Sequence, residues 1–208
     1  MKLRNLVLGA ALSLPLLALA DDMTAGNPFA GAYAGLGLGH TSSDAKVSSP
    51  GEDSGDFGQG SFAGQVVGGY NYAIDNNWLV GAEAFFADNT AKSTGTFADQ
   101  TFTAKMNQTY GADAILGYAF NQTAMIYGGA GWGFSKLKLS GDIDNSTSYT
   151  GWRAVAGAQQ AFTDAFSIRE SVDYTAFKSK TMTVDGLGLS VKPNQFTSML
   201  SFIYTFNM

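Results

Sequence analysis

The chain has 208 residues, with 12 lysines and arginines against 17 aspartates and glutamates, and it contains no cysteine. This acidic balance disfavours a nucleic-acid-binding role, and the lack of cysteine excludes disulfides and thiol chemistry. A single histidine excludes a histidine-rich metal site, and we expect neither a metal nor another cofactor.

The first twenty residues have the three regions of a secretory signal peptide. Two basic residues, Lys2 and Arg4, precede an apolar stretch, and a small-x-small cleavage site ends at Ala20. The apolar stretch is too short to span a bilayer comfortably. We therefore predict a signal peptide over residues 1–20 and one mature domain over residues 21–208.

The mature chain combines few charges with many aromatic residues. Charged residues make up 14% of the sequence, well below the usual quarter, while aromatic residues make up 13%. No mature segment is apolar for 18 residues, so the sequence predicts no spanning helix. An exported chain of this kind is typical of a β-barrel in the outer membrane of a Gram-negative cell.

Eight segments of the mature chain alternate with the period of two that indicates β-strands. They cover residues 30–40, 61–72, 78–88, 103–120, 125–139, 149–162, 166–178 and 195–206. Short connections at 75–77, 121–123 and 163–165 alternate with longer ones at 41–60, 89–102, 140–148 and 179–194. An even strand number and this alternation are typical of outer-membrane barrels. The predicted fold is all-β: an eight-stranded antiparallel up-and-down transmembrane β-barrel with short periplasmic turns and four longer extracellular loops.

The two faces of the predicted strands differ in polarity. One face is apolar, with aromatic residues near the periplasmic ends, and we expect it to meet lipid. The other face holds charges of both signs, which must be paired if they are buried in a narrow barrel. A soluble lipocalin-type barrel would instead place apolar residues inside. The expected interior charge network consists of Glu83, Asp113, Arg153, Arg169 and Asp173.

Glu170 does not fit this division, because it falls on the lipid-facing parity of its predicted strand. Two hypotheses account for it. Either the strand has a β-bulge there, or Glu170 lies low enough to reach the membrane interface.

Several stretches resemble the small outer-membrane barrels, a family that includes the transmembrane domain of outer membrane protein A and the opacity-type surface proteins. They are "EAFFADN", "ILGYAF", "SVDYTAF" and the aromatic final strand. The resemblance implies that Glu83 and Asp173 join an internal salt-bridge network. It also implies that the barrel assembly machinery reads the final strand, with Phe202, Tyr204 and Phe206 as the signal, although Asn207 and Met208 follow here.

Three functions fit the predicted barrel. The first is a non-enzymatic, monomeric membrane scaffold whose surface loops contact host or surface ligands. The second is a narrow, porin-like ion channel. The third is a lipid A-modifying enzyme that uses His40 near Ser42, Ser43 and Asp44. We expect no enzyme and no catalytic residue, because closeness in sequence does not set the geometry of a triad.

Six lysines fall near the predicted outer rim of the barrel. There they either pair with lipopolysaccharide phosphates in the surrounding outer-membrane lipid or act as ordinary solubilising charges. These lysines are Lys92, Lys136, Lys138, Lys178, Lys180 and Lys192.

Overall fold

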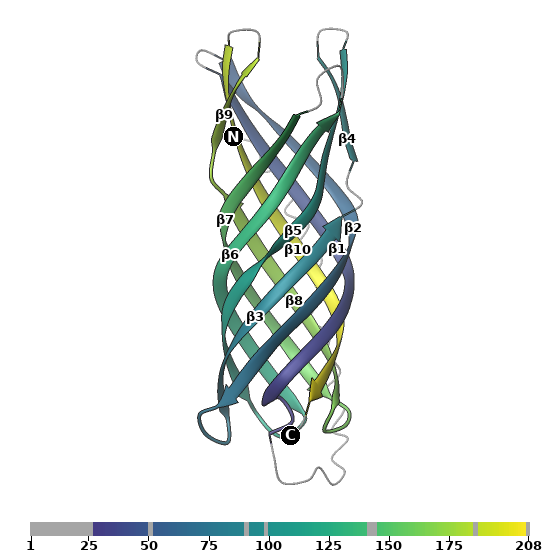
Figure 1. The fold of residues 1–208 in the computed structure, drawn as a ribbon, viewed down its shortest axis with the longest axis vertical. Coiled ribbons are helices and arrows are strands. Elements are labelled where there is room, and N and C mark those ends of the chain that lie inside the picture. The colour runs from purple at the N-terminus through teal and green to yellow at the C-terminus, as the bar shows by residue number, and fades with distance from the viewer. Residues whose placement is uncertain are drawn as a thin grey trace.

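The computed structural model is an elongated barrel of tilted strands (Figure 1). It describes residues 27–49, 52–89, 92–97, 100–140, 145–184 and 187–206. The strands are β1 (Gly31–Ser49), β2 (Glu52–Ala73), β3 (Trp78–Asn89), β4 (Lys92–Phe97), β5 (Gln100–Ala119), β6 (Ala124–Ser140), β7 (Asn145–Ala161), β8 (Phe166–Phe177), β9 (Lys180–Val184) and β10 (Leu187–Phe206). Within these ranges, no helix has the length and apolar character needed to cross a membrane.

The strands form one antiparallel sheet that closes on itself. The order around the ring is β1-β2-β3-β5-β6-β7-β8-β10, and β10 returns to pair with β1. In the described residues, β4 pairs with β5 and β9 pairs with β10, so these two short strands extend hairpins rather than join the ring. The ring therefore has eight strands, which confirms the predicted fold.

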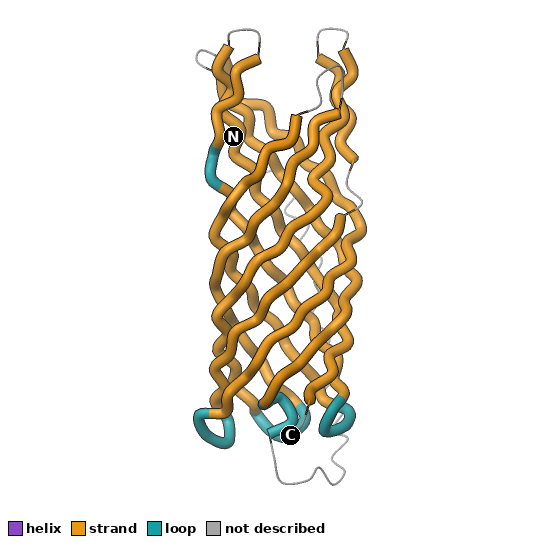
Figure 2. The backbone as a smooth tube through the Cα atoms, viewed as in Figure 1, coloured by secondary structure: helices purple, strands orange, loops and turns teal. Residues whose placement is uncertain are grey.

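The three short turns lie at one end of the barrel, as the sequence predicts (Figure 2). In the first turn, the Asp75 carboxylate accepts hydrogen bonds from the backbone N–H groups of Asn77 at 2.8 Å and Trp78 at 2.7 Å. Asn121 and Thr163 accept equivalent backbone hydrogen bonds in the other two turns. These side chains satisfy backbone donors that the strand ladders leave unpaired.

The four longer connections differ from the expectation of irregular loops, because most of their described residues continue the strands as paired hairpins (Figure 2). The sequence hides this extension because both faces of these segments are polar, while backbone pairing requires no apolar face. The outermost pairs of the hairpins are Ser49↔Glu52, Phe97↔Gln100, Leu139↔Asn145 and Val184↔Leu187.

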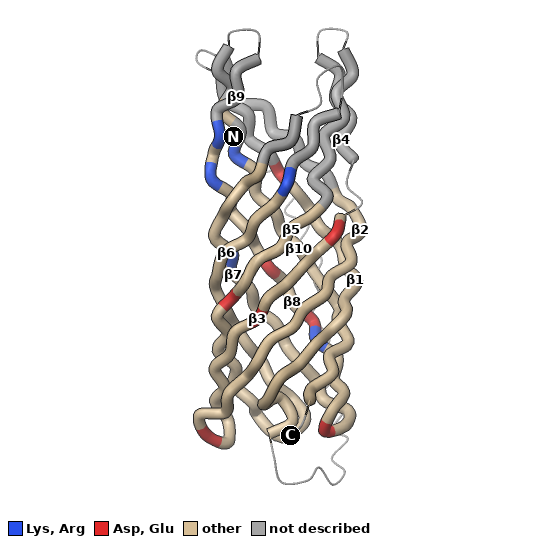
Figure 3. The backbone as a smooth tube through the Cα atoms, viewed as in Figure 1, with Lys and Arg blue, Asp and Glu red and all other residues tan. Residues whose placement is uncertain are grey.

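The outer wall of the ring is apolar and bears two aromatic belts. Charged residues are sparse along the wall between the two ends (Figure 3). The turn-side belt has side chains between 40% and 63% exposed: Tyr70, Tyr72, Trp78, Phe120, Phe162, Phe166, Tyr204 and Phe206. The hairpin-side belt consists of Phe62, Phe86, Tyr110, Trp132, Phe134, Trp152, Tyr174 and Phe196. Two such belts flanking an apolar band mark the two boundaries of a membrane.

Candidate functional site

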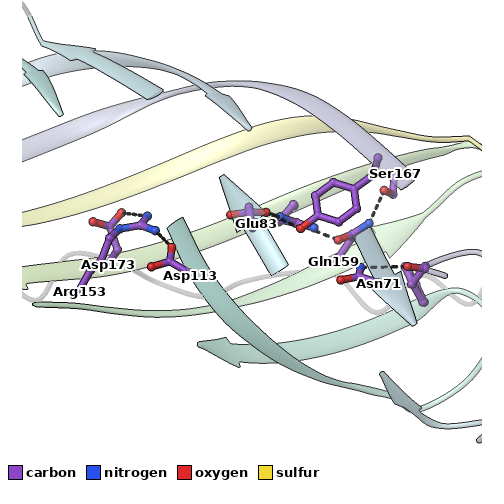
Figure 4. A network of polar contacts seen from close by, with 10 residues as sticks. Asn71, Glu83, Asp113, Arg153, Gln159, Ser167 and Asp173 are labelled. Carbon is purple, nitrogen blue, oxygen red and sulfur yellow. Dashed lines mark hydrogen bonds and ion pairs between the residues drawn. The ribbon is translucent and has the colours of Figure 1, made fainter. Parts of the chain in front are cut away.

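All five charged residues predicted to lie inside the barrel are there, and each is at most 7% exposed. They form two groups that line the lumen (Figure 4). The group nearer the turns is the inner pair, Glu83 with Arg169, and the other is the outer triad, Arg153 with Asp113 and Asp173.

The inner pair is held by polar and aromatic neighbours from three strands, β1, β6 and β7. Arg169 donates to Glu83 from one guanidinium nitrogen, and its Nε donates to Gln159 Oε1 at 2.9 Å. The Tyr33 hydroxyl donates to Glu83 Oε2 at 2.8 Å. The guanidinium also lies 4.9 Å from the ring centres of both Tyr33 and Tyr127. The inner pair thus combines an ion pair with hydrogen bonds and cation–π contacts, as a buried charge requires.

The outer triad places one guanidinium between two carboxylates. Arg153 donates to Asp113 through Nη1, and its Nη2 lies 3.1 Å from Asp173 Oδ2. The guanidinium carbon sits 3.9 Å from the centre of the Phe85 ring. In the described residues, Asp113 Oδ1 and Arg153 Nε have no hydrogen-bond partner. The two groups together hold three carboxylates against two guanidinium groups, and the triad is the less satisfied of the two.

Glycines on the inward face make room for these large side chains. A Cβ added at Gly131 would lie 2.6 Å from Asp113 Oδ1, and one at Gly111 would lie 2.8 Å from the Phe85 ring. Both distances are shorter than real side chains allow. Small residues thus alternate with large ones across the narrow lumen.

Apolar residues close the lumen on the turn side. Phe29, which precedes β1, is 1% exposed and packs in a cluster with Leu79 and Met125. Asn71 Nδ2 donates to the Phe29 carbonyl at 3.0 Å and so holds the segment before β1 at the turn-side end of the barrel. The interior below the inner pair is therefore packed with apolar side chains.

The hairpin-side half of the lumen is lined by hydroxyl and amide groups. Thr41 and Thr197 share a hydrogen bond of 2.7 Å, and Gln195 donates to Thr41 at 3.2 Å. Thr109 donates to Gln195 Oε1 at 3.2 Å. Sequence reasoning missed this network and the Tyr33 and Tyr127 contacts. The alternation of the sequence does place these residues on the inward face, but the prediction of the interior network considered only charged residues.

The predicted rim lysines that can be placed lie at the hairpin end. Lys136, Lys178, Lys180 and Lys192 are exposed. The Lys180 ammonium group lies 5.7 Å from the centre of the Tyr149 ring. The side chains of Lys92 and Lys138 are outside the described part of the structure.

The residues predicted as an assembly signal lie on the outer wall. Phe202, Tyr204 and Phe206 are exposed on β10, and Phe206 pairs with Ala32 at the start of β1. The predicted signal peptide and the last two residues are outside the described residues.

Glu170 is half-buried on the outer face of β8, between Ala158 on β7 and Leu200 on β10. Its register is continuous with both neighbouring strands, so the β-bulge hypothesis is wrong.

His40 is exposed on β1, where its register partners are Phe62 on β2 and Ser198 on β10. Its ring lies over Gly60, because an added Cβ there would be 2.6 Å from Nε2. No hydrogen bond joins His40 to Ser42 or Asp44 in the described residues. The described side chains also include no group of three or more His, Cys, Asp or Glu residues placed to hold a metal ion.

A family model and similar curated proteins all point to outer-membrane proteins. The family model "Outer membrane protein beta-barrel domain" matches residues 6–204. The chain is 28% identical to the 31 kDa outer-membrane immunogenic protein of Brucella melitensis over 165 residues, 73% of this chain and 69% of that protein. It is 31% identical to the 25 kDa outer-membrane immunogenic protein of Brucella ovis over 161 residues, 76% of this chain and 74% of that protein.

A solved structure shows the same fold. The outer membrane protein OprG from Pseudomonas aeruginosa has a TM-score of 0.53 and 13% identity, and the match covers 86% of this chain and 97% of that one. The apolar wall, the aromatic belts, the charged interior and the family match agree. The chain belongs to the outer membrane protein beta-barrel domain family and is a β-barrel protein of the bacterial outer membrane.

Proposed function

We propose that the protein is a non-enzymatic, monomeric scaffold that displays β-hairpins outside the cell for contact with surface or host ligands. The observation that carries this proposal is the length of the strands. β1 and β2 have 19 and 22 residues, whereas a tilted strand needs about 9–11 residues to cross the hydrocarbon core. About half of this hairpin therefore extends past the apolar wall. With the short turns facing the periplasm, the hairpins face outward.

The closed interior supports a scaffold. The inner pair spans the lumen, and the Phe29 cluster fills the space on its turn side. The matched Brucella proteins are named as outer-membrane immunogenic proteins, which agrees with hairpins that are accessible at the cell surface.

Shortening the hairpins tests this proposal. Residues 45–57 of the β1–β2 hairpin are replaced by an Asn-Gly turn, which links the register partners Asp44 and Gly58 and suits a two-residue hairpin connection. A Gram-negative strain displays the full or shortened barrel, and its adhesion to cultured mammalian cells is compared with that of a strain without the protein. We expect the full chain to raise adhesion and the shortened chain to lose most of the gain. Equal adhesion by all three strains, with both barrels folded in the outer membrane, would contradict the proposal.

A narrow channel is the second candidate, and the polar lining of the hairpin-side lumen favours it. The test is single-channel recording from the refolded protein in planar bilayers. We expect no current steps from a barrel closed by the inner pair. Discrete current steps in the wild-type protein that become larger in E83Q or R153Q would show that the protein is a channel rather than a closed scaffold.

The enzyme hypothesis depends on His40. Its ring lies over Gly60, and among the described residues it makes no hydrogen bond to Ser42 or Asp44, which supports a non-enzymatic role. Mass spectrometry of lipid A from cells that express the wild-type protein or H40Q tests this directly. A modified lipid A present with the wild-type protein and absent with H40Q would establish the enzyme.

A further inference from the structure

A row of basic and hydroxyl side chains follows the outer wall across four neighbouring strands. Lys136 on β6 pairs in register with Ser148 on β7, and both are exposed. Two residues further along β7, the Thr150 backbone carbonyl accepts a hydrogen bond from the Lys178 backbone N–H at 2.9 Å, which places Lys178 beside this strand. We call the four residues Lys136, Lys178, Lys192 and Ser148 the basic arc.

Lys192 continues the basic arc on β10. It is exposed. Asn194 pairs with Ala176. In this antiparallel pair, Lys192 is two residues before Asn194 in the sequence and Lys178 is two residues after Ala176, so both lie two residues nearer the hairpin end. Lys178, directly after the end of β8, and Lys192 on β10 therefore lie at the same level. Strands in a sheet are about 4.8 Å apart, so the arc extends about 14 Å from β6 to β10.

The arc lies directly outside the hairpin-side aromatic belt. On the same outward faces, Phe134, Trp152, Tyr174 and Phe196 stand below its members. The Tyr174 and Phe196 positions are paired in register, and the Trp152 and Tyr174 rings meet edge-on at 5.7 Å. Because such a belt marks the boundary of the hydrocarbon, the lysines stand at the level of the lipid headgroups.

Among the side chains that the structure describes, the lysines of the arc have no carboxylate partner. The three ion pairs found among the described residues all lie in the lumen. The nearest acidic position in register is Asp44 on β1, which pairs with Asn194 and forms none of these ion pairs. The chain as a whole is acidic, with a net charge of -5. A cluster of unpaired lysines at the headgroup level therefore points to an anion from the membrane.

We propose that the basic arc binds the phosphate groups of the phosphorylated glycolipid in the outer leaflet, while the aromatic belt packs against its acyl chains. Ammonium groups bind phosphate as point charges, and the Ser148 hydroxyl supplies a further donor. The site depends on the membrane location of the barrel and is independent of what the hairpins contact outside the cell.

The test measures binding of diphosphorylated lipid A to the full barrel refolded in phosphatidylcholine nanodiscs, by native mass spectrometry. The triple variant K136Q/K178Q/K192Q should bind about a hundredfold more weakly, since each lysine near a charged membrane surface contributes roughly a fivefold factor. K136R/K178R/K192R keeps the charges and should bind as the wild-type protein does. Dephosphorylated lipid A should bind the wild-type protein as weakly as the phosphorylated form binds the glutamine variant.

A second control separates the arc from net charge. N76D/N121D/Q122E places three negative charges at the opposite turns and changes the net charge as the glutamine variant does. This variant should retain binding. Equal binding by the wild-type and glutamine variants, or saturation of the site by inorganic phosphate without preference for the glycolipid, would overturn the proposal. Either result would leave the adhesion and conductance tests of the scaffold unaffected.

Discussion

Glu83 and Arg169 form an ion pair although they stand on opposite walls of the barrel. Glu83 is on β3 and Arg169 is on β8, and the ring order places these strands four apart in either direction. The pair therefore crosses the full width of the lumen. It ties together two strands that share no backbone hydrogen bond and fixes the barrel's cross-section at this level.

Removing one partner of this pair should strongly destabilise the barrel. In E83Q, the Arg169 guanidinium stays buried without its carboxylate, and breaking a buried pair in this way costs about 3–5 kcal/mol. The free energy of unfolding in urea, measured for the protein in lipid vesicles, should fall by this amount.

The double variant E83Q/R169Q is the control for uncompensated charge. It should recover part of the loss, because no unpaired charge remains in the lumen. Additive losses from the two single variants would show that the residues do not interact as the structure places them.

The inward glycines should tolerate no side chain. In G131A, the added methyl group would meet the Ala112 carbonyl and Asp113 Oδ1, so we expect a loss of about 1–3 kcal/mol in unfolding free energy. Gly128 is the matched control on the same strand, because its Cβ would meet nothing closer than 3.9 Å. Equal losses in G131A and G128A would show that crowding in the lumen is not the cause.

A charged side chain introduced on the outer wall should lower the free energy of unfolding, and by more the closer it lies to the middle of the bilayer. Leu36 lies in the apolar wall with Val66 and Phe202 as register partners, and L36R should lower the free energy of unfolding by about 2–4 kcal/mol. I74R, in the first turn, should cost only about 0–1 kcal/mol. Unfolding in bilayer vesicles checks both values, and similar costs in detergent micelles and bilayers would argue against lipid contact at Leu36.

The first turn should carry a pH-dependent contribution to stability. The hydrogen bonds from the backbone N–H groups of Trp78 and Asn77 hold the pKa of the Asp75 carboxyl below its ordinary value of 3.8. Because this pKa is lowered by folding, the stabilisation is present above about pH 4 and is lost as the pH falls through the folded-state value. D75A should therefore melt earlier than the wild-type protein at pH 7, and the difference should shrink below pH 3.8.

D75N is the control for the turn, because the amide oxygen still accepts the two backbone hydrogen bonds but does not titrate. Its melting temperature relative to D75A should not change with pH over this range. A wild-type advantage over D75A that persists at pH 2 would contradict the role assigned to the carboxylate.

Sequence alternation predicts most of the ring but not its internal contacts. Parity alone places all five interior charges correctly, because each shares a strand face opposite to the aromatic residues. It does not reveal their partners: Glu83 and Asp113 are direct register neighbours, yet each pairs with an arginine on another strand. Those choices depend on how the strands are staggered when the ring closes, and hydropathy carries no information on the stagger.

The hairpin extensions were missed for a different physical reason. Alternation arises where one strand face meets lipid, so it stops at the aromatic belt although the backbone ladder continues. The sequence places the lysines of the basic arc near the outer rim but does not show which of them are neighbours, because they come from different strands. Only the register brings Lys136 and Ser148 side by side.

The seam between β1 and β10 has a consequence for the order of assembly. It pairs residue 32 with residue 206, so the ring of strands cannot close until β10 has reached the membrane. Until then, water can hydrate the carboxylates and guanidinium groups that later lose their solvent. Closing the seam is thus also the desolvation step, and a chain stopped before β10 would leave its charges facing an open edge.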